Sequence, residues 1–304
     1  MASAQRRSGR PAPGLGLGLW PGLWLGVWLW AACAAAGAGR VQGRGALRDA
    51  GAFRLPAHAR IFGGVNASAH EFPAQVYIVS LLQPGHEPPS GLFCGGTILN
   101  EKWILTAAHC IKHSVRTVLG FGTANKQRLE YQVAARVIPH EEYVLYGRND
   151  NNAENDVGLV EASERLPLDG RAVAAARLPD ALHPLPRGRG VVVTGWGRWT
   201  YDDLQAHPGS TAVLKKLDVH IFPCPGDVSH VICIQTDAGT GICDGDSGGP
   251  LMVNGVFYGV ASYVDNVNDD PMLDPNLHCN EVGSWAVYMS VQAYRPWIHQ
   301  HTGI

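Results

Sequence analysis

Residues 245–250 read Gly-Asp-Ser-Gly-Gly-Pro, and this hexapeptide is the most informative stretch of the chain. Glycines on both sides of Ser247 allow the backbone to turn tightly and to present its amide groups, which leaves the Ser247 hydroxyl exposed at a bend. A serine hydroxyl is a poor nucleophile unless a base, and a group that orients the base, lie nearby. The hexapeptide therefore predicts two partner segments elsewhere in the sequence.

Two other segments supply candidates for the base and the orienting group. Residues 106–110 read Thr-Ala-Ala-His-Cys and place His109 after an apolar run, beside a cysteine that can fix the segment. Residues 155–160 read Asn-Asp-Val-Gly-Leu-Val and place Asp156 at the start of another apolar run, where it can be buried. Alone, such a histidine is usually structural and such an aspartate is usually a helix cap or a solvated residue. Together with Ser247 they indicate a nucleophile, its base and an orienting acid.

In the order His, Asp, Ser, at spacings of 47 and 91 residues, the three segments resemble the chymotrypsin-like serine proteases, and the resemblance extends from Ile61 to the C-terminus. The family template implies that Ser247 attacks the scissile carbonyl and that His109 takes its proton and returns it to the leaving amine. It also implies that Asp156 orients the imidazole. The backbone N–H groups of Gly245 and Ser247 would form the oxyanion hole.

The family resemblance also bears on the substrate pocket. Ser262 matches the serine that supports the buried aspartate and begins the strand that pairs with substrate. Relatives that cut after Lys or Arg have an aspartate where this chain has Gly241, so a basic side chain would be desolvated without a partner. Val264 should narrow the pocket, and Ile242 and Ala286 should give it an apolar lining. We therefore expect elastase-like cleavage after small or medium aliphatic residues.

Residues 60–64 read Arg-Ile-Phe-Gly-Gly and resemble the activation site of the family. Cleavage after Arg60 would free the amino group of Ile61 to pair with Asp246. A buried carboxylate is costly unless it is paired, so this ion pair would hold the Gly245 amide and the pocket walls in their working geometry. We expect residues 40–60 to be an activation propeptide and residues 61–304 to be the catalytic domain.

The first 39 residues have the order of a signal peptide: three arginines before residue 11, an apolar run over 15–32, and small residues over 34–39. An uncleaved membrane anchor is the alternative, because the run is near the lower limit for spanning a bilayer. Pro21 and several glycines weaken that alternative. We expect a secreted, extracellular protein.

The cysteine count agrees with export. Removal of Cys33 with the signal peptide leaves an even set of six, which is typical of disulfides, and their spacings match no zinc site. The family resemblance implies three pairs, Cys94 with Cys110, Cys224 with Cys233, and Cys243 with Cys279. Asn66, in Asn-Ala-Ser, begins an N-glycosylation sequon.

From Ile61 onward, short runs of β-branched and aromatic residues alternate with Gly, Pro, Asn and Asp. This region has 244 residues, which is too many for one small barrel built from such short strands. We therefore expect an all-β fold of two packed antiparallel β-barrels of the chymotrypsin-like type. Residues 291–301 should form a C-terminal helix. The residues from Asp265 to Asn276 should form a long surface loop. The expected strands are 76–82, 103–106, 191–194, 257–261 and 285–289.

Charge and composition limit the partners. The chain has 24 basic and 26 acidic residues and no long basic run, which argues against a nucleic-acid binder. Residues 120–127 contain no carboxylate, so we expect no structural calcium there, no other metal site and no cofactor. The aspartates of the loop 265–276 could bind calcium or form an acidic rim, but a solvated loop is favoured.

The expected partners are protein or peptide substrates, an activating trypsin-like protease and protein inhibitors, and we expect a monomer. One alternative from a different class is a catalytically silent binding protein that keeps the fold. The other is the membrane-anchored protease.

Overall fold

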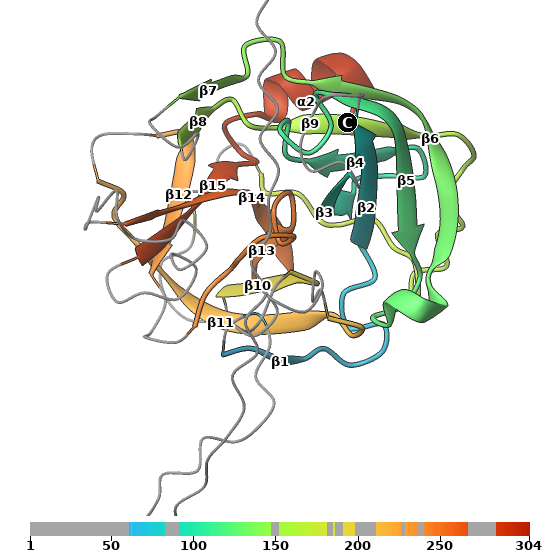
Figure 1. The fold of residues 1–304 in the computed structure, drawn as a ribbon, viewed down its shortest axis with the longest axis horizontal. Helices are drawn as coiled ribbons and strands as arrows, with labels where there is room; N and C mark the ends of the chain where they lie inside the picture. Colours follow the sequence, from blue (N-terminus) through green and yellow to red (C-terminus); the bar gives the residue numbers. More distant parts are fainter. Residues whose placement is uncertain are drawn as a thin grey trace, which may run out of the picture. The chain divides into compact units, whose positions relative to one another are not determined.

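The computed structural model describes residues 61, 63–82, 91–146, 152–180, 185, 191–197, 211–225, 229–235, 240–266 and 284–304, all within the unit 54–304. The proposed signal peptide and propeptide, Arg60 and Cys279 lie outside these residues. Short antiparallel strands form most of the regular structure (Figure 1). No helix among the described residues is long and apolar enough to cross a membrane.

Six strands close the first barrel in the order β2-β3-β4-β9-β6-β5. Their inward side chains come from alternating positions and from runs such as Trp-Ile-Leu-Thr in β4, which is buried throughout. The strands are β2 (Gln75–Leu82), β3 (Leu92–Ile98), β4 (Trp103–Thr106), β5 (Ser114–Phe121), β6 (Glu130–Pro139) and β9 (Gly158–Ala162).

A second sheet has the order β1-β11-β10-β13-β14-β15-β12, and an additional pairing of β11 with β12 closes it into a six-stranded barrel with β1 on its edge. This arrangement confirms the predicted fold class. The strands are β1 (Val65–Asn66), β10 (Val191–Gly195), β11 (Lys215–Phe222), β12 (Val231–Gln235), β13 (Pro250–Val253), β14 (Val256–Asn266) and β15 (Ser284–Ser290).

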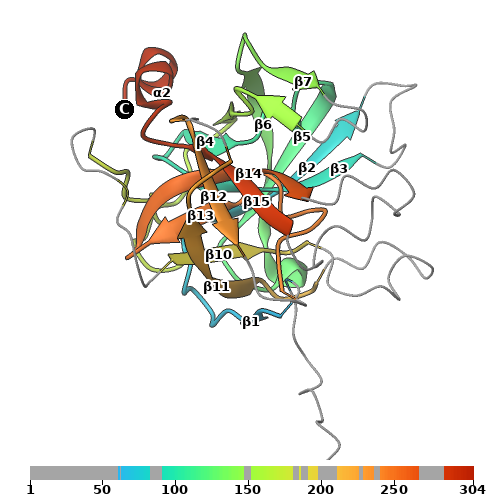
Figure 2. The same ribbon diagram turned by 90° about the vertical axis from the view of Figure 1, so that its left-hand side faces the viewer.

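The remaining elements are a hairpin of β7 (Val144–Tyr146) and β8 (Asn152–Glu154), a short 3₁₀ helix η1 (Lys126–Arg128) and the helix α2 (Arg295–Thr302). Figures 1 and 2 show α2 beside the first barrel, and Ile298 packs into the core of that barrel. The predicted helix start at residue 291 is wrong, because residues 291–294 form a turn. Pro296 explains the later start, since proline is tolerated only in the first turn of a helix.

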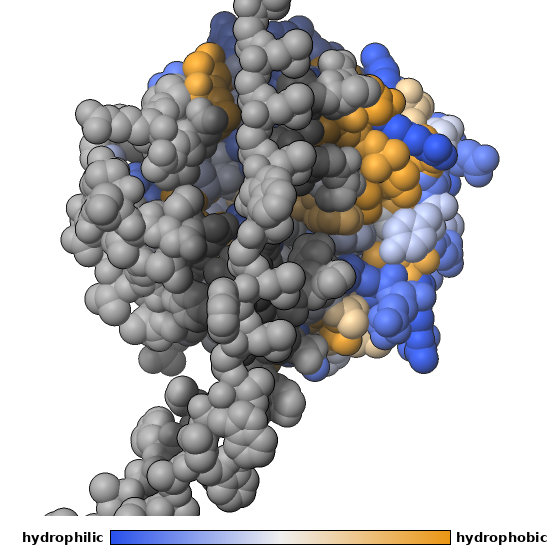
Figure 3. Space-filling view, viewed as in Figure 1, coloured by the Kyte–Doolittle hydropathy of each residue, from blue (hydrophilic) through white to orange (hydrophobic). Residues whose placement is uncertain are grey.

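Each strand expected from the sequence is present, although β14 is longer than expected. It runs to Asn266, so the predicted loop does not include Asp265 and Asn266, which pair with β15. Residues 267–276 of that loop lie outside the described residues. One cluster of buried hydrophobic residues fills the first barrel and extends to Phe257, Val260 and Met289 of β14 and β15, and a second cluster lies within the second barrel. Outside these cores, Leu81 and Val115 are exposed, and Figure 3 shows hydrophobic side chains among polar ones on the first-barrel side of the view.

The two barrels meet where the strand β3 approaches the loop before β13. Gly95 donates its N–H to the carbonyl of Ser247 at 2.7 Å, and Thr194 Oγ1 donates to Gln75 Oε1 at 2.6 Å. A Cβ on Gly95 would lie 2.7 Å from Gly249 Cα, which is closer than real Cβ contacts. Glycine at this position therefore allows the close backbone approach that brings both barrels to the candidate site.

Candidate active site

The loop that carries Ser247 has the bend expected from its glycines. Gly245 and Gly248 have φ values of 91° and 75°, in the left-handed region that favours glycine. A side chain on Gly248 would also overlap Thr106 Oγ1 at the end of β4. Gly248 donates its N–H to the Ala261 carbonyl of β14 at 2.7 Å. These contacts leave Ser247 half-buried at the junction of the two barrels.

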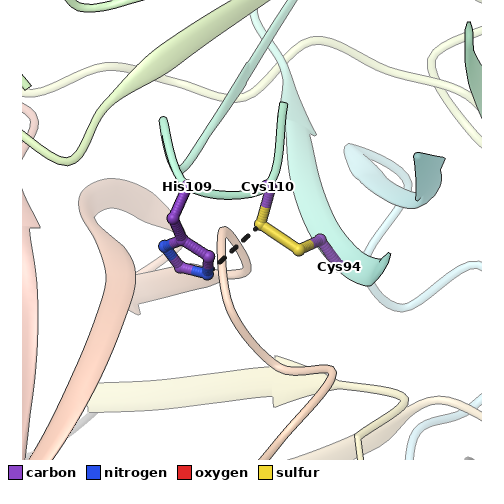
Figure 4. A group of neighbouring side chains, drawn as sticks. All are labelled: Cys94, His109 and Cys110. Carbon is purple, nitrogen blue, oxygen red and sulfur yellow. Dashed lines mark hydrogen bonds between the residues drawn. A yellow bond between two sulfur atoms is a disulfide. The ribbon is translucent and has the colours of Figure 1, made fainter. Parts of the chain in front are cut away.

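His109 follows β4 in a turn. Its side chain is 26% exposed, and its Nδ1 lies 2.7 Å from Asp156 Oδ2. The adjacent Cys110 forms the predicted disulfide with Cys94 of β3, which ties the turn to the first barrel. Figure 4 shows the imidazole beside this disulfide, with Nε2 3.6 Å from Cys110 Sγ. With the Nδ1 proton directed at the carboxylate, Nε2 keeps the lone pair that a general base needs.

Asp156 lies between β8 and β9 and is fully buried. The preceding Asn155 has a φ of 52°, and asparagine adopts this left-handed conformation more readily than most residues. The carboxylate accepts hydrogen bonds from the His109 N–H at 2.9 Å and from Ser262 Oγ at 2.6 Å, in addition to its contact with the imidazole. The Tyr294 hydroxyl, at the start of α2, donates to Asn155 Oδ1 at 3.1 Å.

Opposing effects set the pKa values of this pair. Burial alone would lower the pKa of His109, but the charge of Asp156 and the hydrogen bond to it raise the pKa above 6.5. Burial would raise the pKa of Asp156, but the charge of His109 and the hydrogen bonds from His109 and Ser262 lower it below 3.8. The arrangement stabilises an imidazolium next to a carboxylate. That charge state arises when a histidine takes a proton from a nucleophile.

Among the described residues, Ser247 Oγ makes no hydrogen bond to His109, and the loop contacts of Ser247 involve its backbone carbonyl. The three segments are nevertheless brought together, because Gly248 packs on Thr106 and Ala107 while the neighbouring Ser262 bonds Asp156. The N–H groups of Gly245 and Ser247 have no acceptor within the described part of the chain.

Asp246 is buried immediately before the candidate nucleophile. Its carboxylate accepts hydrogen bonds from the N–H groups of Gly197 at 2.8 Å and of Cys243 at 3.0 Å. Burial raises the pKa of Asp246 to about 7, and the nearby Asp244 carboxylate adds to this rise against the two hydrogen bonds. Ile61 is fully buried and has a φ of 43°, which is strained for a β-branched residue.

The predicted pocket residues all lie in the second barrel. Gly241, Ile242 and Ala286 are buried, and Ile242 and Ala286 belong to the core of that barrel. Val264 is half-buried and pairs directly with Ala286 across β14 and β15. Ser262 lies two residues before Val264, at an irregularity in the same strand pairing.

The structure also describes other predicted sites. Cys224 and Cys233 form the second predicted disulfide. Cys243 is also disulfide-bonded, and its predicted pairing with Cys279 stays a prediction. Asn66 is exposed in β1. Cys94, His109 and Cys110 lie close enough to bind a metal ion, but the two sulfurs are bonded to each other and offer no thiolate.

Several supporting residues were not predicted. Gly95 and Gly197 donate to the Ser247 loop through backbone N–H groups, and Tyr294 acts through Asn155. A glycine N–H leaves no local sequence signal. The Tyr294 contact depends on how α2 docks 139 residues after Asn155.

Comparisons with known proteins agree with this architecture. Residues 61–298 match the family model described as Trypsin. The chain is 32% identical to chymotrypsin-2 of Vespa crabro over 249 residues, which cover 79% of this chain and 99% of that protein. It is 29% identical to trypsin of Sus scrofa over 249 residues, covering 79% of this chain and 95% of that protein.

A similar solved structure is that of HL collagenase. It has a TM-score of 0.63 and 27% sequence identity, and the match covers 80% of this chain and 99% of that one. The family match spans far more than half of the sequence and includes all three candidate catalytic segments. The chain therefore belongs to the trypsin family of chymotrypsin-like serine proteases.

Proposed function

We propose that this chain is a secreted serine endopeptidase, made as a zymogen, that hydrolyses peptide bonds through an acyl-enzyme. The observation that carries the proposal is the hydrogen-bonded series from Ser262 through the buried Asp156 to His109, beside the loop of Ser247. In this mechanism Ser247 Oγ attacks the scissile carbonyl as His109 Nε2 takes its proton. The imidazolium then protonates the leaving amine, and water hydrolyses the acyl-enzyme by the same route.

The N–H groups of Gly245 and Ser247 would bind the oxyanion that develops during attack. Their lack of an acceptor among the described residues supports this role, since a donor already occupied inside the protein could not stabilise the transition state. Each such donor contributes about two to three powers of ten in rate. Gly245 is suited to this position because its φ of 91° directs the peptide at low steric cost.

Activation would begin with cleavage between Arg60 and Ile61 by a trypsin-like protease. The new ammonium group of Ile61 would pair with Asp246, whose pKa is raised by burial and which has no cationic neighbour among the described residues. Pairing would convert this unfavourable carboxylate into a stabilising one and hold Gly245 in its working position. The precursor would remain inactive because Gly245 and the pocket walls lack the support of this ion pair.

The primary specificity pocket would accept small or medium aliphatic side chains, as in elastase-like relatives. Gly241 supplies no negative charge, and Val264 beside Ala286 reduces the width available to an aromatic ring. One methylene changes discrimination by only about 1–3 kcal/mol, so we expect a graded preference among Ala, Val and Leu. Substrates would be proteins or peptides, and substrate-like protein inhibitors would bind the same cleft.

Export is supported by the disulfides and by the exposed Asn66 of the glycosylation sequon. We propose a monomeric extracellular enzyme without a cofactor, from which residues 1–39 and 40–60 are removed. N-terminal sequencing tests this processing directly. A mature chain beginning at Ile61 is expected, whereas retention of residues 1–39 would favour the membrane-anchored alternative.

The test of the proposed activity is a peptide-library assay on the chain cleaved at Arg60. Cleavage after Ala, Val or Leu is expected from the wild type and none from Ser247→Ala, which removes only the nucleophilic oxygen. Gly241→Asp should shift the preference towards Lys and Arg, because it places a carboxylate at the pocket floor. A wild-type chain that is cleaved, folded and inactive would support the alternative, a catalytically silent binding protein. The absence of a Ser247–His109 hydrogen bond among the described residues is also compatible with that alternative.

A further inference from the structure

The outer face of the first barrel carries a row of apolar side chains. Residues that pair directly across neighbouring antiparallel strands project from the same face of the sheet. Val79 of β2 pairs with Phe93 of β3 and with Val118 of β5, and Val118 pairs with Val133 of β6. These four side chains therefore form one apolar row across four strands.

Two further side chains widen this row. Tyr131 of β6 pairs with Gly120, and its ring lies over that glycine, where a Cβ would be 2.8 Å from Tyr131 Cε1. The Tyr131 hydroxyl donates to the Lys126 carbonyl at 3.0 Å, which holds the ring in place. On the other side of the row lies Leu81, two residues after Val79. We call this set the outer-face patch, and it consists of Val79, Leu81, Phe93, Val118, Tyr131 and Val133.

With respect to the described residues, the outer-face patch is open to solvent. Tyr131 is 53% exposed, Leu81 41% and Val133 36%, and the other three side chains are half-buried. Figure 3 shows hydrophobic side chains in the region of β2 and β5. Apolar side chains that gather on one exposed face are typical of an interaction site. The patch is therefore a candidate docking surface for another chain.

One end of the patch reaches the candidate active site. The Phe93 carbonyl lies 3.8 Å from the position that a Cβ on Gly245, the proposed oxyanion donor, would take. The next residue, Cys94, forms the disulfide with Cys110 that lies beside the imidazole of His109 (Figure 4). In the proposed mechanism His109 gives its proton to the leaving amine. The segment after the scissile bond would therefore leave the site on the side of the patch.

The charge on this face indicates which kind of segment it fits. Arg116 of β5 pairs with Leu81, so its side chain projects from the same face. It is exposed and has no partner among the described residues. The described outward positions of β2, β3, β5 and β6 around the patch hold no acidic residue, since Glu130 belongs to the opposite face of β6. An apolar segment followed by an acidic residue complements this face.

We propose that the outer-face patch binds the part of a protein substrate that follows the scissile bond, an extended segment with apolar side chains and then an acidic residue. This inference rests on the proposed proteolytic function. Arg116 lies two strands and four residues away from Gly95, whose N–H donates to the Ser247 carbonyl, which is roughly 16 Å in a sheet. An extended chain spans this distance in about five residues. The acidic side chain therefore belongs at about the fifth residue after the scissile bond.

The test compares a long and a short peptide substrate of the chain cleaved at Arg60. Both share the acyl half and the first two residues after the scissile bond. The long substrate adds Leu-Val-Glu, which places Glu at the fifth residue, and the short substrate ends in an amide. The long substrate should have a kcat/KM about tenfold higher, mainly through a lower KM, because contacts far from the reacting bond act equally on substrate and transition state. Cleavage of both substrates with equal kcat/KM would overturn the proposal.

Variants locate the effect on the patch. Val133→Asp should remove the advantage of the long substrate. Arg116→Glu should reduce this advantage about fivefold and restore it for a long substrate with Lys at the fifth residue. The short substrate does not reach the patch and is the internal reference, and melting temperatures show that the variants remain folded. If both variants keep the full advantage, the patch is not the docking surface.

Two substitutions elsewhere serve as matched controls. Val65→Asp and Arg171→Glu make the same changes at exposed positions outside the patch, and both should keep the full advantage of the long substrate. Wild-type dimers that Val133→Asp abolishes, seen by sedimentation, would assign the patch to a second copy of the chain and overturn the proposal.

Binding without catalysis separates the patch from the proposed activity. If neither substrate is cleaved, the proteolytic proposal fails, and both peptides are titrated against the Ser247→Ala chain by fluorescence anisotropy. A dissociation constant about tenfold lower for the long peptide, with the difference lost in Val133→Asp, would still support docking of such a segment on the patch. Equal dissociation constants would overturn it.

Discussion

Replacement of Asp246 by Asn should stabilise the uncleaved precursor at neutral pH, although it removes a residue that the activated enzyme needs. Burial raises the pKa of Asp246 from its ordinary value of 3.8 to about 7. A shift of this size corresponds to about 4 kcal/mol of unfavourable free energy when the carboxyl group ionises in the folded state. Asn carries no charge but can accept only one of the two N–H bonds, which costs about 1 kcal/mol. The net stabilisation at pH 8 should be about 3 kcal/mol.

The stability of the precursor should depend on pH in a direction set by the raised pKa of Asp246. Between pH 4 and pH 7 the folded precursor binds more protons at Asp246 than the unfolded chain does, so its stability falls as pH rises through this range. Well below pH 4 both states are protonated and the penalty is absent. Asp246→Asn should remove the loss of stability that ionisation of Asp246 causes. The free energies of unfolding of the wild type and the variant should therefore differ little at pH 4 and most at pH 8.

Urea unfolding of the precursor in the Ser247→Ala background measures this difference. After cleavage at Arg60, Asp246→Asn should destabilise the protein instead of stabilising it, because it leaves the Ile61 ammonium group buried and unpaired. The free energy of unfolding should then fall by about 3–5 kcal/mol. Destabilisation of the precursor at pH 8 as large as that of the cleaved chain would refute the reasoning. It would show that Asp246 already has a cationic partner before activation.

Three further changes test the site. Ser262→Ala removes the 2.6 Å hydrogen bond to the Asp156 carboxylate and should lower kcat/KM by about tenfold, measured against a peptide substrate, with a nearly unchanged KM; an unchanged rate would deny Ser262 a supporting role. Activity should fall as pH drops through the pKa of His109, which is raised above 6.5. Asp156→Asn should lower the rate by about 10⁴-fold, the magnitude known for this change in serine proteases. It should also move the acid limb of the pH–rate profile to lower pH, because the carboxylate that raises the His109 pKa is gone. An acid limb that stays in place would show that Asp156 does not set this pKa. Replacing Cys94 and Cys110 together by Ala opens a loop of 16 residues and should lower the free energy of unfolding by about 3 kcal/mol in urea, and a loss below about 1 kcal/mol would contradict the chain-entropy estimate.

Local chemistry explains which features could be predicted from the sequence. The glycines around Ser247, the apolar runs beside His109 and Asp156 and the short β-rich segments each act through a few neighbouring residues. The all-β class, the two barrels and the two described disulfides followed from these signals and from the family resemblance.

Long-range packing explains what could not be predicted. The end of β14 at Asn266 is set by pairing with β15, which overrides the loop preference of Asp and Asn. The N–H groups of Gly95 and Gly197 act at the site only because the barrels bring them there. The pairing of Gln75 with Thr97 depends on the register of β2 and β3, which their separate sequence positions do not reveal.

The most direct test of the proposed mechanism is covalent labelling of the chain cleaved at Arg60 with an organophosphonate, followed by mass spectrometry of its peptides. The reagent needs a serine oxygen activated by an imidazole, so it reports whether His109 and Ser247 act together. We predict one phosphonylated residue, Ser247, in the wild type and almost none in His109→Ala. An unlabelled wild type, or equal labelling of Ser247 in both proteins, would contradict the proposed catalytic site.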